Sequence, residues 1–193
     1  MAAGVVDRME GGQVTLFDFT DPSADLSSWV ESSDTAREVG KSKGAFVLQK
    51  TQLFQRAVFF GLLNPQDSGA CFVGFNRTMA LNLSPTSSIT IKSRGQGKCT
   101  SFKIALKHHG DISSLTPSYE YFFQAPTGDE LSVLEFPLTE FLPYIRGKLQ
   151  NDSEPLDTSD ITSFGIQLYG GVYEDVKQSG PATLEIDWIK VSN

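Results

Sequence analysis

Apolar and polar side chains alternate with a period of two residues in three stretches of the chain. In each stretch three apolar residues occupy alternate positions, and polar or small residues stand between them. Because successive side chains of a β-strand point to opposite faces, this pattern predicts strands with one face on a core and the other toward water. The three apolar sets are Phe102, Ile104 and Leu106; Phe164, Ile166 and Leu168; and Leu184, Ile186 and Trp188.

Shorter or less regular runs predict further strands, with turns between them. Gly, Pro, Asn and Asp mark the turns, for example at Asn64-Pro65 and at Gly180-Pro181. About ten strands at hairpin spacing, with scarcely any amphipathic helix, predict an all-β fold, an antiparallel β-sandwich. The further strands are expected at Val14–Phe19, Ala45–Thr51, Arg56–Leu62, Ala70–Phe75, Ser88–Ser93, Tyr119–Gln124 and Leu131–Phe136.

We expect one domain over residues 1–193, with its core roughly between residues 14 and 191 and a short N-terminal tail. Three prolines keep residues 138–158 mostly as loop, with a helical turn around Thr139–Leu142. They are Pro137, Pro143 and Pro155.

The last predicted strand changes parity along its length. Leu184, Ile186 and Trp188 share one parity, whereas Ile189 and Val191 occupy the other. A β-bulge near Trp188 would move the apolar side across the strand. We therefore expect a bulge there, with Trp188 in the core.

The composition excludes some classes of protein. The formal charge is −7 and the basic residues are scattered, which disfavours binding to nucleic acid. The longest apolar run, Ala57–Leu63, is far shorter than the roughly 20 residues of a membrane span. The N-terminus shows neither an apolar signal segment nor the basic balance of a mitochondrial transit peptide, so an intracellular protein is expected. We expect Cys71 and Cys99 to be buried thiols, with one disulfide between them as the alternative.

The segment Gly40-Lys41-Ser42-Lys43-Gly44 fits the Gly-x-Ser-x-Gly pattern of a hydrolase nucleophile elbow. Such an elbow requires a helix after the serine, but the next residues, AFVLQK, are typical of a strand. Ser42 is therefore predicted to lie in a surface turn, and its replacement by alanine is expected to change little.

The two histidines, His108 and His109, are adjacent at the end of a predicted strand. Neighbouring residues of an extended strand point to opposite faces, so one metal ion cannot easily bind both. With no Cys/His cluster nearby, we expect solvated histidines, no metal site, no cofactor and no catalytic residues.

Several short motifs follow one another in a fixed order along most of the chain. They are Trp29 with Asp34 five residues later, Gly40–Gly44, Ser93–Lys98, Phe136–Phe141 running into Arg146-Gly147, Ile161–Ile166 and Gly180–Ile189. Together, from about residue 17 to residue 191, they resemble the complex I intermediate-associated protein 30 (CIA30) domain family. The resemblance implies a jelly-roll sandwich of the galactose-binding-like type. It also implies a role like that of the founding members, which are non-enzymatic chaperones for the assembly of mitochondrial respiratory complex I.

The aromatic run Tyr119–Gln124 is the strongest candidate for a working surface. Its two parities are Tyr119, Tyr121 and Phe123 on one side, and Glu120, Phe122 and Gln124 on the other. If the second set faces outward, an aromatic ring flanked by hydrogen-bonding groups suits sugar or protein binding. A second buried layer under a loop is the alternative. The candidate binding residues are Phe122, Glu120, Gln124, Arg94, Lys103, Gln167 and Tyr169.

These observations predict a non-catalytic binding domain that works through protein contacts. By the resemblance, the partners would be assembly intermediates of a respiratory complex and the compartment would be the mitochondrion, with the cytoplasm as the alternative. Related modules on this sandwich bind carbohydrate on a concave sheet face, so a carbohydrate-binding module is the second hypothesis. An enzyme or carrier with a small-ligand pocket is the third.

Overall fold

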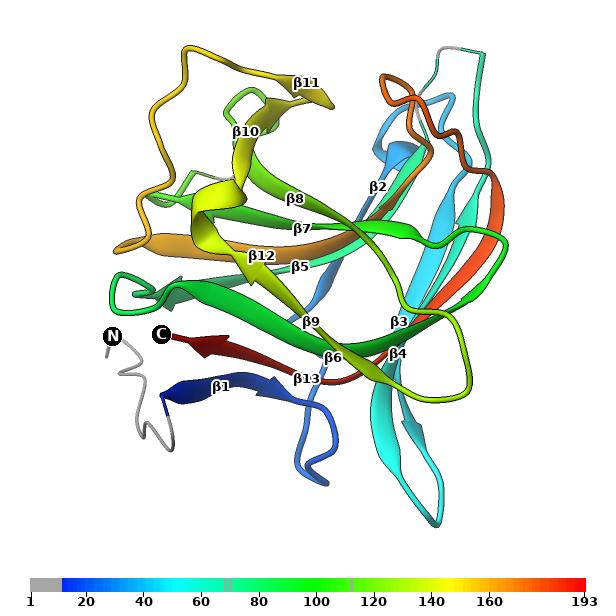
Figure 1. Cartoon of the computed structure of the whole chain (residues 1–193). Coiled ribbons are helices and arrows are strands. Elements are labelled where there is room, and N and C mark those ends of the chain that lie inside the picture. The colour runs from blue at the N-terminus through cyan, green and yellow to red at the C-terminus, as the bar shows by residue number, and fades with distance from the viewer. Residues whose placement is uncertain (1–11, 68, 70, 112) are drawn as a thin grey trace.

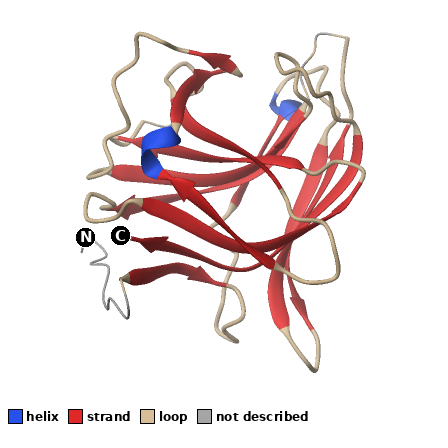
Figure 2. Ribbon diagram, viewed as in Figure 1, coloured by secondary structure: helices blue, strands red, loops and turns tan. Residues whose placement is uncertain are grey.

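Two antiparallel β-sheets pack face to face in the computed structural model (Figures 1 and 2). The structure describes residues 12–67, 69, 71–111 and 113–193. Residues 1–11 of the predicted N-terminal tail and Ala70 lie outside the described residues. The prediction of an antiparallel jelly-roll sandwich is confirmed.

The first sheet has six strands in the order β3-β4-β13-β6-β9, with β1 also paired to β13. The long strand β13 is its centre, because β13 pairs with β6 on one side and with both β4 and β1 on the other. The strands are β1 (Gln13–Asp18), β3 (Lys43–Lys50), β4 (Gln55–Leu63), β6 (Ser88–Gly97), β9 (Ser132–Pro137) and β13 (Gly180–Ser192).

The second sheet has seven strands in the order β11-β10-β8-β7-β12-β5-β2. Two short 3-10 helices, η1 (Asp34–Ala36) and η2 (Leu138–Glu140), connect strands of the sandwich. The strands are β2 (Val30–Ser33), β5 (Phe72–Leu81), β7 (Ser101–His108), β8 (Ser118–Gln124), β10 (Leu142–Ile145), β11 (Lys148–Leu149) and β12 (Ile161–Tyr169).

The predicted strands are all present, but three short ones were missed. Strands β10 and β11 lie within the stretch expected to be mostly loop, and Pro143 stands inside β10. Proline is tolerated there because β10 is a short strand near the edge of its sheet. The expected helical turn is η2, which begins one residue earlier and ends two residues earlier than predicted.

Aromatic rings join the two sheets across the core. Phe17 of β1 lies 5.5 Å from Phe164 of β12, and Phe59 of β4 lies 5.3 Å from Phe75 of β5, measured between ring centroids. Trp29 packs among the same rings and is almost fully buried. Edge-to-face pairs such as these add about 0.5–1.5 kcal/mol each beyond the burial of their area.

The predicted bulge in the last strand is confirmed. The register of β13 against β6 shifts between Ile186 and Trp188, where the neighbour of β13 on the other side changes from β4 to β1. Beyond the bulge Ile189 and Val191 are fully buried. The placement of Trp188 in the core was wrong: its ring is half-buried and lies beneath the ammonium of Lys190, at 4.5 Å.

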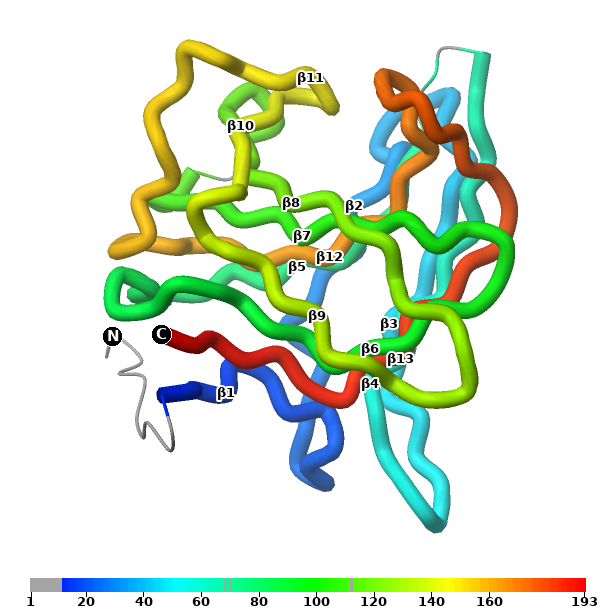
Figure 3. Tube along the Cα trace, viewed as in Figure 1, coloured from blue at the N-terminus to red at the C-terminus, as the bar shows by residue number. Residues whose placement is uncertain are grey.

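The first and last described residues lie together at one end of the sandwich. The backbone N–H of Asn193 donates to the carbonyl of Gly12 at 3.2 Å, and the chain trace in Figure 3 ends there beside β1. This end is remote from the β10–β11 hairpin and from the segment that follows β12 (Figure 1).

Candidate binding cleft

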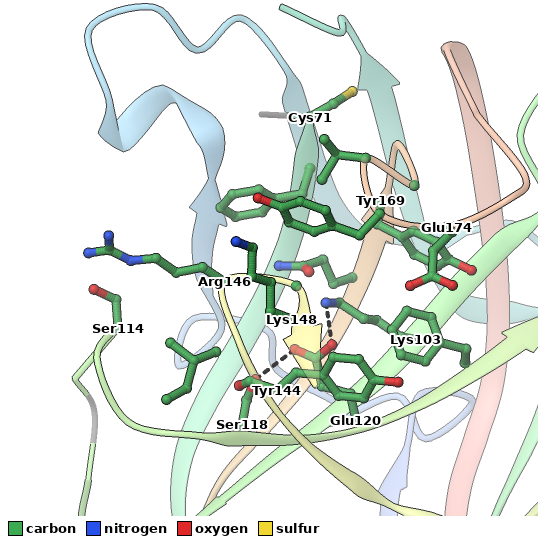
Figure 4. A pocket seen from close by; sticks show the side chains of 18 of the residues that line it. Cys71, Lys103, Ser114, Ser118, Glu120, Tyr144, Arg146, Lys148, Tyr169 and Glu174 are labelled. Atoms are coloured by element: carbon green, nitrogen blue, oxygen red, sulfur yellow. Dashed lines mark hydrogen bonds and ion pairs between the residues drawn. The ribbon is translucent and has the colours of Figure 1, made fainter. Parts of the chain in front are cut away.

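A cleft of about 680 Å³ lies on the outer face of the seven-stranded sheet. The β10–β11 hairpin and the segment after β12 rise on opposite sides of it (Figure 1). Figure 4 shows the labelled side chains converging on it from these elements and from the sheet. The cleft is therefore built from the sheet as a floor and two connecting segments as walls.

Small residues occupy outward positions on the central strands, next to residues that line the cleft. The outward positions of β5, β7 and β12 include Gly74, Ala105 and Gly165, which pair with larger outward residues of the neighbouring strands. A Cβ atom at Gly74 would lie 2.9 Å from the Cβ of Gln167 and 2.6 Å from the carbonyl oxygen of Ile166. A side chain at Gly74 would therefore clash with β12.

Phe122 stands at the aromatic centre of the floor. Strand register places Phe122, Lys103 and Gln167 in one row across β8, β7 and β12. The Phe122 ring lies 5.2 Å from Tyr144 and 5.1 Å from Tyr169, at interplanar angles of 65° and 90°. The floor is thus a group of steeply inclined rings.

A buried ion pair lies beside these rings. The ammonium of Lys103 donates to Glu120 at 2.5 Å, and both side chains are less than a tenth exposed. Ser118 donates to the other carboxylate oxygen at 2.6 Å, as the dashed lines in Figure 4 show. The same ammonium lies 5.4 Å from the Phe122 ring centroid. Lys103 and Glu120 neutralise one another, and the Lys103 charge also interacts with the aromatic rings.

The environment of the floor shifts the pKa values of its two tyrosines. Burial raises the pKa of Tyr169, and burial likewise raises the pKa of Tyr144. Both phenols therefore stay protonated at neutral pH.

The two walls have internal supports. Arg146 and Gly147 form the two-residue turn of the β10–β11 hairpin, both with positive φ, 51° and 77°. On the other wall, the ammonium of Lys177 donates to the carbonyls of Gly171, Val172 and Glu174. These contacts give both walls a defined shape without a bound ligand.

Five of the seven predicted site residues line the cleft. They are Lys103, Glu120, Phe122, Gln167 and Tyr169. The β8 side chains that face outward there belong to the set that the sequence analysis considered for binding. Gln124 lies at the end of β8, where it bonds to Thr100 and Ser101. Sequence reasoning missed Tyr144, Lys148 and Tyr173, because they belong to segments whose conformation no periodic pattern predicts.

Arg94 does not share this face, contrary to expectation. It lies on β6 of the other sheet, where its guanidinium donates to Glu185 at 2.7 and 2.9 Å. Arg56 also binds Glu185, at 2.5 Å, and Gln96 donates to the same carboxylate. The error arose because outward parity alone does not reveal which of the two sheets a strand joins.

Ser42 lies in the interior, and the prediction of a surface turn was wrong. Its side chain is fully buried and donates to a carboxylate oxygen of Asp34 at 2.6 Å, while its backbone N–H donates to the other oxygen at 2.9 Å. The N–H of Phe72 also donates to Asp34, at 3.2 Å. Asp34 thus ties η1 to the starts of β3 and β5, which is a structural role.

The flanking Gly40 has no room for a side chain. A Cβ there would lie 1.9 Å from the carbonyl oxygen of Asp34. The glycine of the Gly-x-Ser-x-Gly pattern therefore permits a close approach of two backbone segments.

The expectation that His108 and His109 point to opposite faces was also wrong. Their rings stack at 4.1 Å, because His109 leaves the strand with a φ of 56°. The ring of His109 contacts Asp157 at 2.8 Å, and the backbone N–H of Asp157 donates to His108. Among the described residues, no group of three or more His, Cys, Asp or Glu side chains is placed to hold a metal ion.

The pKa values of the two imidazoles are expected to depart from the ordinary histidine value in opposite directions. The hydrogen bond to Asp157 raises the pKa of His109, whereas burial lowers the pKa of His108. NMR titration is expected to show His109 titrating above about pH 6.5 and His108 below it. Because the folded-state pKa of His109 is raised, its ion pair with Asp157 stabilises the fold at low pH. This stabilisation is lost as the pH rises through that pKa. Asp157→Asn should lower the His109 midpoint. A shared midpoint for both rings would contradict the assignment.

Cys71 and Cys99 are both free and buried, as expected. In the described part of the chain no helix is long and apolar enough to cross a bilayer.

Comparison with known proteins agrees with the sequence motifs. Residues 17–186 match the family model described as Complex I intermediate-associated protein 30 (CIA30). The chain belongs to the CIA30 family. The mouse protein "Complex I intermediate-associated protein 30, mitochondrial" is 25% identical over 183 residues, which cover 86% of this chain and 52% of the mouse protein. The chain therefore spans about half the length of this CIA30 relative.

Solved structures show the same fold at low sequence identity. The family 11 carbohydrate-binding module of Clostridium thermocellum, solved with a β-1,3-1,4-mixed-linked tetrasaccharide, has a TM-score of 0.67 and 15% identity, covering 94% of this chain and 96% of the module. A family 30 carbohydrate-binding module has a TM-score of 0.55 and 13% identity, covering 94% of this chain and 99% of that one. These likenesses show that this CIA30 chain has a fold of the galactose-binding-like type.

Proposed function

We propose that this chain is a non-catalytic binding domain that works through protein contacts at the cleft, as an assembly factor. Membership of the CIA30 family supports this role, because the mouse relative is named for its association with a complex I intermediate. By the same relationship, the proposed compartment is the mitochondrion and the proposed partners are assembly intermediates of a respiratory complex.

The observation that carries the proposal is the combination of an aromatic floor with exposed apolar and charged residues at the rim. Val172 and Tyr173 on one wall are 44% and 57% exposed, and Arg146 and Lys148 stand on the other. Protein interfaces concentrate their binding energy in central aromatic anchors that a polar surround shields from water. Phe122, flanked by Tyr144 and Tyr169, suits the role of such an anchor.

Carbohydrate binding is the second candidate, and the open groove with Tyr144, Tyr169 and Gln167 favours it. The family 11 module of the same fold was solved with a tetrasaccharide. Sugars, however, stack best on flat, open ring faces. In the floor, the Phe122 ring is inclined at 65° to Tyr144 and at 90° to Tyr169. The geometry therefore supports protein binding better.

Photo-crosslinking tests the two candidates. We would place p-benzoylphenylalanine at position 173 and, as a matched control, at position 60, because Tyr173 and the Phe60 ring on the other sheet are similarly exposed, 57% and 48%. In mitochondria, position 173 is expected to give adducts with defined proteins, identified by mass spectrometry, and position 60 is not. Phe122→Ala in the position-173 background should lower these adducts at least tenfold while the protein stays folded.

Calorimetry with the mixed-linked tetrasaccharide completes this test. The proposal would be overturned in favour of the carbohydrate candidate if the sugar binds saturably and position 173 gives no more protein adducts than position 60. Adducts specific to position 173 without sugar binding would support it.

A further inference from the structure

The cleft concentrates positive charge in a chain that is negative as a whole. Its lining includes five basic side chains, Arg37, Lys103, Lys107, Arg146 and Lys148, and two acidic ones, Glu120 and Glu174. The local balance is +3, against a formal charge of −7 for the entire chain. Such a reversal of sign over a concave surface attracts ligands of the opposite charge.

Two of the five cations are already engaged within the protein. Lys103 is paired with Glu120 at the floor. The ammonium of Lys107 donates to the carbonyl oxygens of Ser113 and Thr116, and burial lowers its pKa. The charge available to a ligand therefore comes from the rim.

The three remaining cations stand exposed at the rim. Arg37 follows η1, whereas Arg146 and Lys148 belong to the β10–β11 hairpin. Within the described residues neither guanidinium has a hydrogen-bond or ion-pair partner. Lys148 lies 5.2 Å from the ring centroid of Tyr173 on the opposite wall.

Arg146 also occupies an unfavourable backbone position. The two-residue turn demands positive φ at both residues, a demand that Asn-Gly meets best. Arg146 adopts this conformation with a φ of 51°, which is strained for a side chain of this size. Backbone strain of this kind is often found at functional positions, so it favours a role for the Arg146 side chain.

We propose that the cleft takes an extended, carboxylate-rich segment of the partner protein, held by Arg37, Arg146 and Lys148 at the rim and by apolar contact with Phe122 and Tyr173. This inference rests on the proposed protein-binding function and adds the chemistry of the partner. Guanidinium groups bind carboxylates bidentately, and the rings with Val172 give room for apolar side chains between the acidic ones. The protein source is preferred over an acidic glycan because the floor lacks a flat stacking platform.

A synthetic peptide tests the inference without knowledge of the partner. The probe is a fluorescein-labelled 12-residue peptide that repeats Glu-Leu-Glu-Ser, and its control repeats Gln-Leu-Gln-Ser. Fluorescence anisotropy at 50 mM NaCl is expected to show saturable binding of the acidic peptide and none of the control. Its Kd should rise on the order of tenfold by 300 mM NaCl, because exposed charges are screened.

Charge variants of the protein place the binding in the cleft. The triple variant Arg37→Gln/Arg146→Gln/Lys148→Gln is expected to raise the Kd about tenfold or more. The matched control Lys41→Gln/Lys43→Gln/Lys98→Gln removes the same charge from exposed positions outside the cleft and should change the Kd less than twofold. Arg37→Gln alone, which leaves the hairpin untouched, should weaken binding by about threefold and covers the case of a triple variant that fails to fold.

Three results would overturn the inference: no saturable binding of the acidic peptide up to 1 mM, an equal loss in the control triple variant, or tighter binding of an alginate hexamer or a dT12 oligonucleotide. Its failure is distinguishable from that of the proposed function. Protein adducts from position 173 together with peptide failure would leave the protein-binding function standing, whereas loss of those adducts would count against the function itself.

Discussion

Asp34→Ala is expected to lower the free energy of unfolding by about 4 kcal/mol. The substitution removes the acceptor of three hydrogen bonds, among them those from the buried N–H of Ser42 and the partly buried N–H of Phe72. Hydrogen bonds to a charged group contribute about 1.5–3 kcal/mol each, and buried unsatisfied donors cost about 1–3 kcal/mol. Urea unfolding followed by circular dichroism measures the change.

Matched variants separate this network from a general effect of charge. Asp152→Ala removes an exposed carboxylate and should cost less than about 0.5 kcal/mol. Ser42→Ala should cost about 1–2 kcal/mol, in contrast to the silent substitution that the sequence predicted. The double variant Asp34→Ala/Ser42→Ala should cost less than the sum of the single ones, because they share one network. Strict additivity would show that the two side chains act independently.

Glu185→Gln is expected to cost about 3 kcal/mol, because it leaves Arg94 without its ion-pair partner and Arg56 with only the more distant Asp187, at 3.5 Å. The side chains of Arg56, Arg94 and Glu185 are only 9–17% exposed, and breaking such a pair from one side is strongly destabilising. Glu38→Gln, a change at an exposed glutamate, is the matched control and should cost little. An equal cost for the two variants would mean that the outer face of the six-stranded sheet does not depend on Glu185.

The pH dependence of stability provides an independent measurement of the same residue. Burial opposes the Glu185 charge, but the hydrogen bonds from Arg94 and Arg56 outweigh it, so the pKa is lowered. Because the folded-state pKa is lowered, the stabilisation by ionised Glu185 is complete above the ordinary glutamate pKa of about 4.3. It is lost as the pH falls through the pKa that Glu185 has in the folded protein. The stability difference between wild type and Glu185→Gln should therefore shrink below pH 4.

Strand periodicity was sufficient to predict the sandwich, but it left open which parity of β8 faces outward. The shared face of Phe122, Lys103 and Gln167 followed only on the condition that Glu120, Phe122 and Gln124 face outward, because alternation fixes which side chains share a face once the strands pair. The bulge near Trp188 was also predictable from the change of parity. The Trp188 side chain was assigned to the wrong side because the pattern does not say on which residue the bulge falls.

The rest depended on information that periodicity does not carry. Whether two strands belong to one sheet or to opposite sheets is set by non-local pairing, which is why Arg94 was misplaced. The walls of the cleft come from a proline-interrupted segment and a loop held by Lys177, and neither has a repeating pattern. Ser42 looked like a turn residue because its neighbours are glycine and lysine, but its burial follows from Asp34, eight residues earlier.

The hydrogen bond between Gly12 and Asn193 has a consequence for engineering. Because these residues already lie in contact, a short linker can join them in a chain of residues 12–193, and that chain can be reopened in an exposed turn such as Thr51–Phe54 with the same strand pairing. A circular permutant of this kind keeps the cleft walls continuous, since neither the β10–β11 hairpin nor residues 170–179 is cut. Reporters attached at the new termini would then sit at the tip of the β3–β4 hairpin, away from the joined end.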